Sequence, residues 1–174
     1  MKKQIFMELD KALHMVDLLL KKDFVVNGKT YNLAKCGWKF KGFDRAVNRL
    51  GVCYGGAKKI GLSKKMTQLR PEHGVKNTIL HEIAHAIDNE IHGHSDHSYQ
   101  WEKIAKSIGC SGERCTNVNN ELSDAGMKSE EIIKKSYKYV GVCPTHGVLG
   151  GWTRKPKNNK LCKLCRSRIE IKEN

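Results

Sequence analysis

Apolar residues recur along the chain with two different spacings. In residues 3–21, 77–88 and 98–108 they follow the i, i+3, i+4, i+7 pattern of amphipathic helices. Residues 24–31 place an Asn-Gly pair between β-forming flanks, which predicts a hairpin. Short strands are expected around 51–54 and 58–62, joined by a glycine-rich turn, and over 137–142. The chain is therefore expected to contain both helices and short strands.

The middle predicted helix carries His81 and His85, with Glu82 directly after the first histidine. Residues four apart lie on one face of a helix, so both imidazoles can reach a single zinc ion at about 2.0–2.1 Å. Glu82 would lie beside that ion and accept a proton from the attacking water. A His-Glu-x-x-His pattern also arises by chance, and a catalytic site requires a third ligand downstream.

Three downstream histidines are candidates for that ligand: His92, His94 and His97. Gly93 is expected to end the helix, so that the chain can turn back over the metal. His97 is favoured because it opens the next predicted helix, whose apolar stripe would hold it in place. The sequence leaves the choice between His94 and His97 open. The prediction is a catalytic zinc ion bound by the two motif histidines and His97, with an open fourth position.

A second set of metal ligands lies near the C-terminus. Cys143 and His146 form one knuckle, and Cys162 and Cys165 form another, each with two intervening residues. This spacing fits a zinc ribbon, and the alternative is two unrelated clusters. Protein would fill all four positions around this zinc, so we expect it to be structural.

Basic residues and one aromatic residue lie between the two knuckles: Trp152, Arg154, Lys155, Lys157 and Lys160. An exposed aromatic ring among cations suits phosphate contact and base stacking on single-stranded nucleic acid. A solvated ribbon loop is the alternative interpretation. These five residues are the predicted nucleic-acid contacts.

The chain of 174 residues has a formal net charge of +14, from 32 Lys and Arg against 18 Asp and Glu. Such an excess favours polyanions, nucleic acid first among them, over a membrane surface. The alternative is a generally basic, solvated surface. The N-terminal residues lack the apolar core of a signal peptide, and no window suits a membrane span.

The seven cysteines are therefore expected to be reduced in a cytosol-like compartment, where clustered cysteines more often bind metal than form disulfides. The predicted location is cytoplasmic, either associated with the nucleoid or, for a virus-encoded protein, in the host cytoplasm. The expected partners are protein substrates and DNA, with single-stranded DNA favoured.

An ordered series of positions between about residues 38 and 165 resembles the SprT-like (Spartan) family of zinc metalloproteases. The series is Trp38, Phe43, Ala46, Arg49, Gly51, Cys53, Ile60, Leu62, Ser63, His81, Glu82, His85, His97, Trp101, Ile108, Gly109 and the ribbon cysteines. Such a series is more specific than the His-Glu-x-x-His pentapeptide alone.

The resemblance implies an α+β, zincin-like metalloprotease domain, with helices packed on a small, mainly antiparallel sheet, followed by a zinc ribbon. The domain would span residues 1–130, with helix 3–21 packing on it, and the ribbon residues 137–170. The resemblance also implies that His81, His85 and His97 bind zinc and that Glu82 is the catalytic base. His146 departs from the cysteine common in the family, but histidine is a competent zinc ligand.

In zincin-like architectures an edge strand beside the metal binds the substrate peptide by backbone pairing. Residues 58–62 are the candidate edge, with an ordinary sheet strand as the alternative. The expected activity is zinc-dependent cleavage of DNA-associated proteins, stimulated by DNA. Specificity would be loose and set by DNA tethering rather than by a deep side-chain pocket.

Two other functions are compatible with parts of the sequence. A nucleic-acid-binding or transcription-associated module could keep the zinc sites with little proteolysis, although it would not need Glu82. A peptidase acting on small peptides or on a cell-wall crosslink is the third interpretation, and the lack of a secretion signal weighs against it.

Overall fold

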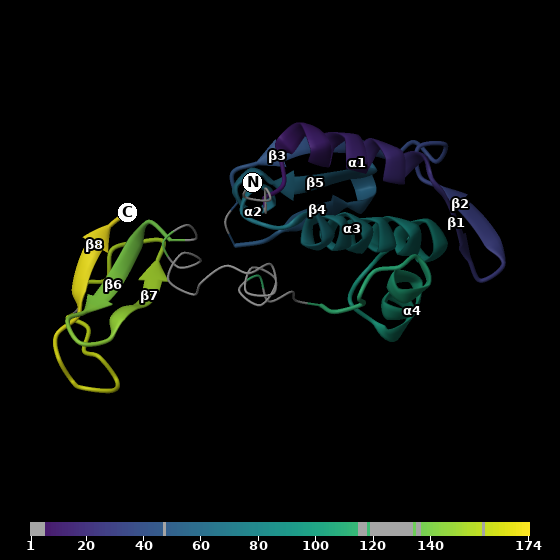
Figure 1. Ribbon diagram of the computed structural model, residues 1–174. Coiled ribbons are helices and arrows are strands. Elements are labelled where there is room, and N and C mark those ends of the chain that lie inside the picture. Colours follow the sequence, from purple (N-terminus) through teal and green to yellow (C-terminus); the bar gives the residue numbers. More distant parts are fainter. Residues whose placement is uncertain (1–5, 47, 115–117, 119–133, 135–136, 158) are drawn as a thin grey trace. The chain divides into compact units, whose positions relative to one another are not determined.

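The computed structural model describes residues 6–46, 48–114, 118, 134, 137–157 and 159–174. The chain divides into two compact units, Met1–Val118 and Asn119–Asn174 (Figure 1). The predicted domain limit at residue 130 lies outside the described residues. In the described part of the chain, no helix has the length and apolar content needed to cross a membrane.

The first unit begins with helix α1, Leu9–Lys21. The helix therefore starts later than the predicted residue 3; residues 1–5 lie outside the described part, and residues 6–8 are not helical. Met7 is buried, and its backbone N–H donates to the carbonyl of Arg70, which draws this segment away from the helix axis. The buried face of α1 includes Leu19, whereas Leu13 is 47% exposed.

The predicted hairpin is present. Strands β1, Asp23–Val26, and β2, Lys29–Asn32, pair antiparallel around Asn27 and Gly28. Both turn residues have positive φ, 52° and 75°, as the tightest hairpin turns require. Phe24 and Tyr31 face each other across this ladder and are buried in the core.

A three-stranded mixed sheet has the order β3-β5-β4. Its strands are β3, Lys39–Asp44, β4, Gly51–Tyr54, and β5, Lys59–Ser63. Strand β5 pairs parallel with β3 and antiparallel with β4. The candidate edge strand at 58–62 was therefore a wrong prediction, because both sides of β5 are paired. The edge strands are β3 and β4.

Three helices follow the sheet: α2, Lys64–Gln68, α3, Glu72–His92, and α4, Tyr99–Ser107. The predicted stripe of α3 is buried: Ile83, Ala84 and Ile87 are fully inaccessible, and Leu80 is 4% exposed. Ile79, outside the predicted stripe, is fully inaccessible as well. Ile60 and Leu62 of β5 belong to the same apolar core. Figure 1 shows α3 alongside β4, and the two elements are in contact. This contact positions the middle of α3 beside an edge strand.

The second unit contains a three-stranded antiparallel sheet in the order β7-β6-β8. Its strands are β6, Tyr139–Cys143, β7, Gly147–Trp152, and β8, Glu170–Glu173. Among the described residues of this unit, those of hydrophobic type that are buried are Val140 and the two knuckle cysteines Cys143 and Cys162. Because so few apolar side chains are buried, we expect a bound metal to supply much of its stability.

Candidate active site

Helix α3 presents His81, Glu82 and His85 from one turn. The helix continues without interruption to His92, and Gly93 ends it in the left-handed conformation with φ 75°, as the sequence predicted. The histidine rings are half-buried, whereas Glu82 is 6% exposed. Both histidine rings contact the ring of Trp101 from α4, with centroids 4.6 Å and 5.0 Å away. Packing on Trp101 therefore restricts the ring orientations of both candidate ligands.

The turn after Gly93 brings His97 to the two motif histidines. The Nε2 atom of His97 lies 3.1 Å from Nε2 of His81 and 3.2 Å from Nε2 of His85. Two nitrogen ligands of a tetrahedral zinc ion are about 3.3–3.4 Å apart. Three converging ring nitrogens at nearly this spacing fit a zinc ion, and the three residues form one candidate metal cluster.

The other candidate histidines lie elsewhere. His92 Nδ1 is 2.7 Å from a carboxylate oxygen of Asp88, and His94 Nδ1 is 3.1 Å from the backbone carbonyl of His92. The structure thus brings His97, rather than His94, into the cluster.

The surroundings of the cluster favour neutral imidazoles. His85 Nδ1 is 2.7 Å from Oγ of Ser95, so the ring can donate there and keep the Nε2 lone pair for a metal. Burial and neighbouring histidines lower the pKa of His85 to about 3, and burial and His97 lower the pKa of His81 to about 4. Neutral histidine is the form that binds metal.

Glu82 points toward strand β4 and lies against Gly51. A Cβ atom at residue 51 would be 2.7 Å from Oε1 of Glu82, which is closer than side chains pack. Burial raises the pKa of Glu82 to about 8, and the nearby charge of Arg49 acts in the opposite direction. A metal cation in the histidine cluster would also favour the carboxylate.

Sequence reasoning missed several residues around this cluster. Ser95 had no motif signal. Arg114 lies seven residues beyond the end of α4 at Ser107, yet its charge, after burial, lowers the pKa of His97. Cys53, for which the sequence indicated no role of its own, lines a hollow with the three histidines. Burial and then the charge of Glu82 raise its pKa to about 12, so it is a neutral thiol. These roles depend on contacts between segments far apart in sequence.

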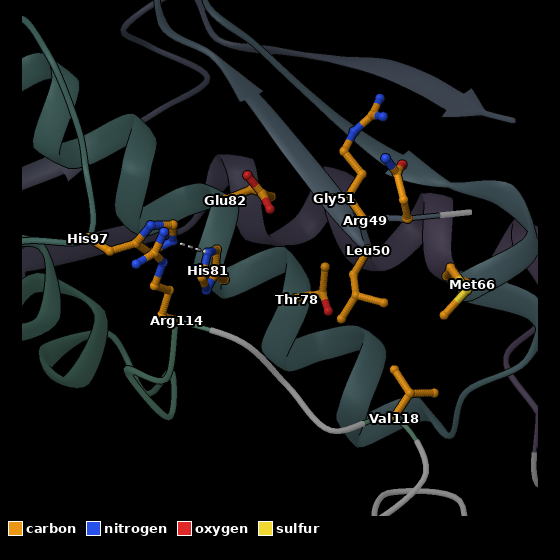
Figure 2. A pocket seen from close by; sticks show the side chains of 11 residues that line it. Arg49, Leu50, Gly51, Met66, Thr78, His81, Glu82, His97, Arg114 and Val118 are labelled. Atoms are coloured by element: carbon orange, nitrogen blue, oxygen red, sulfur yellow. Dashed lines mark hydrogen bonds between the residues drawn. The ribbon is translucent and has the colours of Figure 1, made fainter. Parts of the chain in front are cut away.

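A cavity of about 400 Å³ opens beside His81 and Glu82. Figure 2 shows His97 and Arg114 at one end of it and Met66 and Val118 toward the other. The cluster is therefore open to a ligand on this side, as a catalytic metal site requires.

The second unit gathers the four knuckle residues into one cluster. Cys143 Sγ is 3.5 Å from Cys165 Sγ and 3.6 Å from His146 Nδ1, and Cys162 Sγ is also 3.6 Å from His146 Nδ1. Ligands of a tetrahedral zinc ion lie about 3.8 Å apart for two sulfurs and about 3.6 Å for sulfur and nitrogen. Hydrogen bonds with Ser167 lower the pKa of Cys165 to about 6, which favours the thiolate. The four residues fit a structural zinc.

Three of the predicted nucleic-acid contacts, Lys155, Lys157 and Lys160, line a second cavity of about 520 Å³ together with Arg168. The ring of Trp152 is half-buried over Gly141, where an added Cβ would be 2.8 Å from it. The aromatic ring is therefore less exposed than the sequence suggested. Arg154 is exposed and lies outside the lining of this cavity.

Comparison with curated proteins gave no match, and comparison with solved structures gave none either. Among protein families, the SprT-like family matches residues 17–123. The matched segment contains the last part of α1, the mixed sheet and the complete histidine cluster with Glu82. It spans more than half of the chain, so this protein belongs to the SprT-like family.

Proposed function

We propose that this chain is a zinc-dependent endopeptidase that cleaves DNA-associated proteins and that single-stranded DNA stimulates the cleavage. Membership of the SprT-like family indicates a zinc metalloprotease-type function. The observation that carries the proposal is the position of Glu82, a buried carboxylate one residue from the first of three converging histidines. A purely structural zinc site does not need such a carboxylate.

A zinc ion held by the three histidines would supply a Lewis acid that polarises the scissile carbonyl and acidifies the attacking water. Glu82 takes the proton from that water and passes it to the leaving amine. The space left by Gly51 fixes where the carboxylate sits. Ser95 holds the ring of His85 in the orientation that leaves Nε2 toward the cluster.

Strand β4 is the element best placed to bind the substrate backbone. It is an edge strand, and its first residue, Gly51, is in close contact with Glu82. A peptide added antiparallel to β4 would extend the sheet past the catalytic carboxylate. Backbone pairing of this kind recognises an extended segment, so the substrate is expected to be locally unfolded.

The association with DNA is supported by charge. The formal net charge is +14, and the cavity in the second unit is lined by Lys155, Lys157, Lys160 and Arg168. In the first unit, Lys39 and Lys59 are neighbours in the β3–β5 ladder, and both are exposed. Like charges side by side in a sheet are unfavourable unless an anion compensates them.

The test is cleavage of a DNA-binding protein by the full chain, with and without single-stranded DNA, with bound zinc measured in parallel. Glu82→Gln and a chelator are the controls. We expect cleavage that DNA increases and that Glu82→Gln abolishes, with two zinc ions per chain.

DNA binding with two zinc ions and no cleavage would favour a binding module instead. Cleavage that DNA leaves unchanged at moderate salt would overturn the DNA part of the proposal and keep the peptidase.

A further inference from the structure

The cavity beside Glu82 has the size of a ligand site. Its volume is about 400 Å³, within the range of pockets that enclose small molecules. It is lined on one side by His81 and Glu82 and begins where strand β4 begins, at Leu50 and Gly51. A substrate lying along β4 would therefore pass its side chains directly over this cavity.

The direction of the strand indicates which substrate residue enters. A peptide antiparallel to β4 runs from the Tyr54 end toward the Gly51 end, because β4 itself runs from Gly51 to Tyr54. Glu82 lies at the Gly51 end, and the cavity extends from there past Leu50 and Asn48. The cavity thus lies on the carboxyl side of the scissile bond.

Much of the lining farther from the histidines is apolar. Leu50, Met66 and Val118 contribute to it, and all three are partly exposed, as expected of residues that border a cavity. Thr78 also lines it, but its hydroxyl accepts a hydrogen bond from Arg70 at 2.6 Å and is 3.3 Å from the carbonyl of Gly74. Figure 2 shows Leu50 and Thr78 between the histidines and Val118.

Among the described residues that line the cavity, two arginines carry a formal positive charge. Arg49 forms an ion pair with Asp44, so its charge is largely compensated. Arg114 is exposed, lies beside His97 in Figure 2 and makes no ion pair with any residue that the structure describes. A cationic substrate side chain would meet this charge, whereas an apolar side chain would not.

We propose that this cavity is the enzyme's side-chain specificity pocket. It takes a large apolar side chain, such as leucine, methionine or phenylalanine, from the residue after the scissile bond, and Arg114 excludes lysine and arginine there. The inference rests on the proposed endopeptidase function and adds a sequence preference to it. The proposal differs from the expectation that specificity is loose and set by DNA tethering rather than by a deep side-chain pocket.

The first experiment measures cleavage. The full chain with DNA digests an unfolded protein, the cut sites are mapped by mass spectrometry, and peptides that differ only after the mapped bond are compared. Filling an apolar pocket with several methylene groups is worth about tenfold or more in kcat/KM. We expect kcat/KM for the leucine and methionine peptides to exceed that for the alanine peptide by at least about tenfold, and kcat/KM for the lysine peptide to be lower than that for the alanine peptide.

The second experiment measures binding without cleavage. Two peptide hydroxamates, which chelate zinc, differ only in the side chain directed to the pocket, isobutyl in one and methyl in the other. We expect the zinc-loaded chain to bind the isobutyl compound about tenfold more tightly. This measurement tests the pocket even if no substrate is cleaved.

Variants of Arg114 test the exclusion of cations. We expect Arg114→Gln to raise kcat/KM for the lysine peptide to the value for the alanine peptide. Arg114→Glu should raise kcat/KM for the lysine peptide above that value at low salt. The matched control is Lys76→Glu, which makes the same charge change on the exposed side of α3 and outside the cavity lining. Zinc content and thermal unfolding show whether each variant is folded.

Cleavage without regard to the residue after the bond, together with equal binding of both hydroxamates, would overturn the pocket and leave the endopeptidase standing. Tighter binding of the isobutyl hydroxamate without cleavage of any protein would retain the pocket and overturn the endopeptidase. A lysine peptide cleaved as well as the leucine peptide would overturn the role of Arg114.

Discussion

Gly51 and Glu82 are in direct contact, and the contact is possible only because residue 51 has no side chain. A Cβ atom there would lie 2.7 Å from Oε1 and 2.8 Å from Cγ of Glu82. The φ angle of Gly51 is not in the left-handed region, so the backbone would accept another residue. The glycine is needed for space, and the space determines where the catalytic carboxylate lies.

We therefore expect Gly51→Ala to displace Glu82 and lower kcat/KM by about 100-fold, because a shift of about 1 Å in a catalytic group has effects of that size. The histidines do not depend on this space, so zinc content should stay unchanged. The matched control is Gly56→Ala in the neighbouring turn, where a Cβ meets nothing within 4 Å. Equal activity of the two alanine variants would show that Glu82 tolerates the displacement.

The hydrogen-bonding partner of His85 gives a second prediction. Ser95 Oγ lies 2.7 Å from Nδ1 of His85 and fixes the ring. Removal of such a partner typically weakens metal affinity by about 10–100-fold, and we expect Ser95→Ala to do so. Zinc affinity is measured by competition with a chelator of known strength.

The control for that measurement is Ser107→Ala, which removes a serine hydroxyl at the end of α4, 2.7 Å from the carbonyl of Ile104. Its zinc affinity should equal that of the unaltered chain. If Ser95→Ala also left the affinity unchanged, the geometry of the histidine cluster would have to be fixed by the packing on Trp101 alone.

The local parts of the site follow from the sequence. The spacing of His81 and His85, the helix end at Gly93 and the return of His97 all depend on neighbours within a few turns of chain, and the structure shows them as expected. The apolar stripe on α4 was predicted in the same way, from residues such as Trp101 and Ile104 that lie three positions apart. The structure confirms that both are buried.

The sheet was harder to predict because its pairing is nonlocal. Strand β3 was not foreseen, and it pairs in parallel with β5, which lies beyond β4 in the chain. In the structure, Ile60, Gly61, Leu62 and Ser63 are buried in succession, as in a strand paired on both sides and covered on both faces. The contacts of Gly51 and Arg114 require the finished fold. Gly51 belongs to the series of positions that resembles the family, but the series does not show which side chain it contacts, and Arg114 is not part of it.

The buried carboxylate should also affect stability when the metal is removed. Burial raises the pKa of Glu82 to about 8 in the folded chain, from an ordinary value of 4.5. Between these values the folded state binds more protons than the unfolded state, so stability falls as the pH rises from about 4.5 to about 8. Glu82→Gln removes this dependence.

The measurement is the thermal midpoint of the metal-free chain and of metal-free Glu82→Gln across this pH range. We expect the thermal midpoint of the variant, relative to that of the unaltered chain, to increase as the pH rises, by roughly 5 °C or more at pH 8. The lowered pKa values of His81 and His85 act in the opposite direction, but they are present in both proteins and cancel in the difference. A difference that stays constant with pH would mean that Glu82 is hydrated or paired in the metal-free chain.

The two metal clusters lie in separate compact units, which makes them separable by mutation. Cys162 is 1% exposed and is one of four ligands, so Cys162→Ser should lower the zinc content from two ions to one and unfold the ribbon. His146→Cys keeps four ligands and should keep two zinc ions.

We expect the Cys162→Ser variant to retain hydrolysis of a short peptide while losing most of its stimulation by DNA, because the basic cavity of the second unit depends on the folded ribbon. Loss of both zinc ions in Cys162→Ser would show instead that the histidine cluster requires the ribbon, and the two units would then have to be treated as one catalytic body.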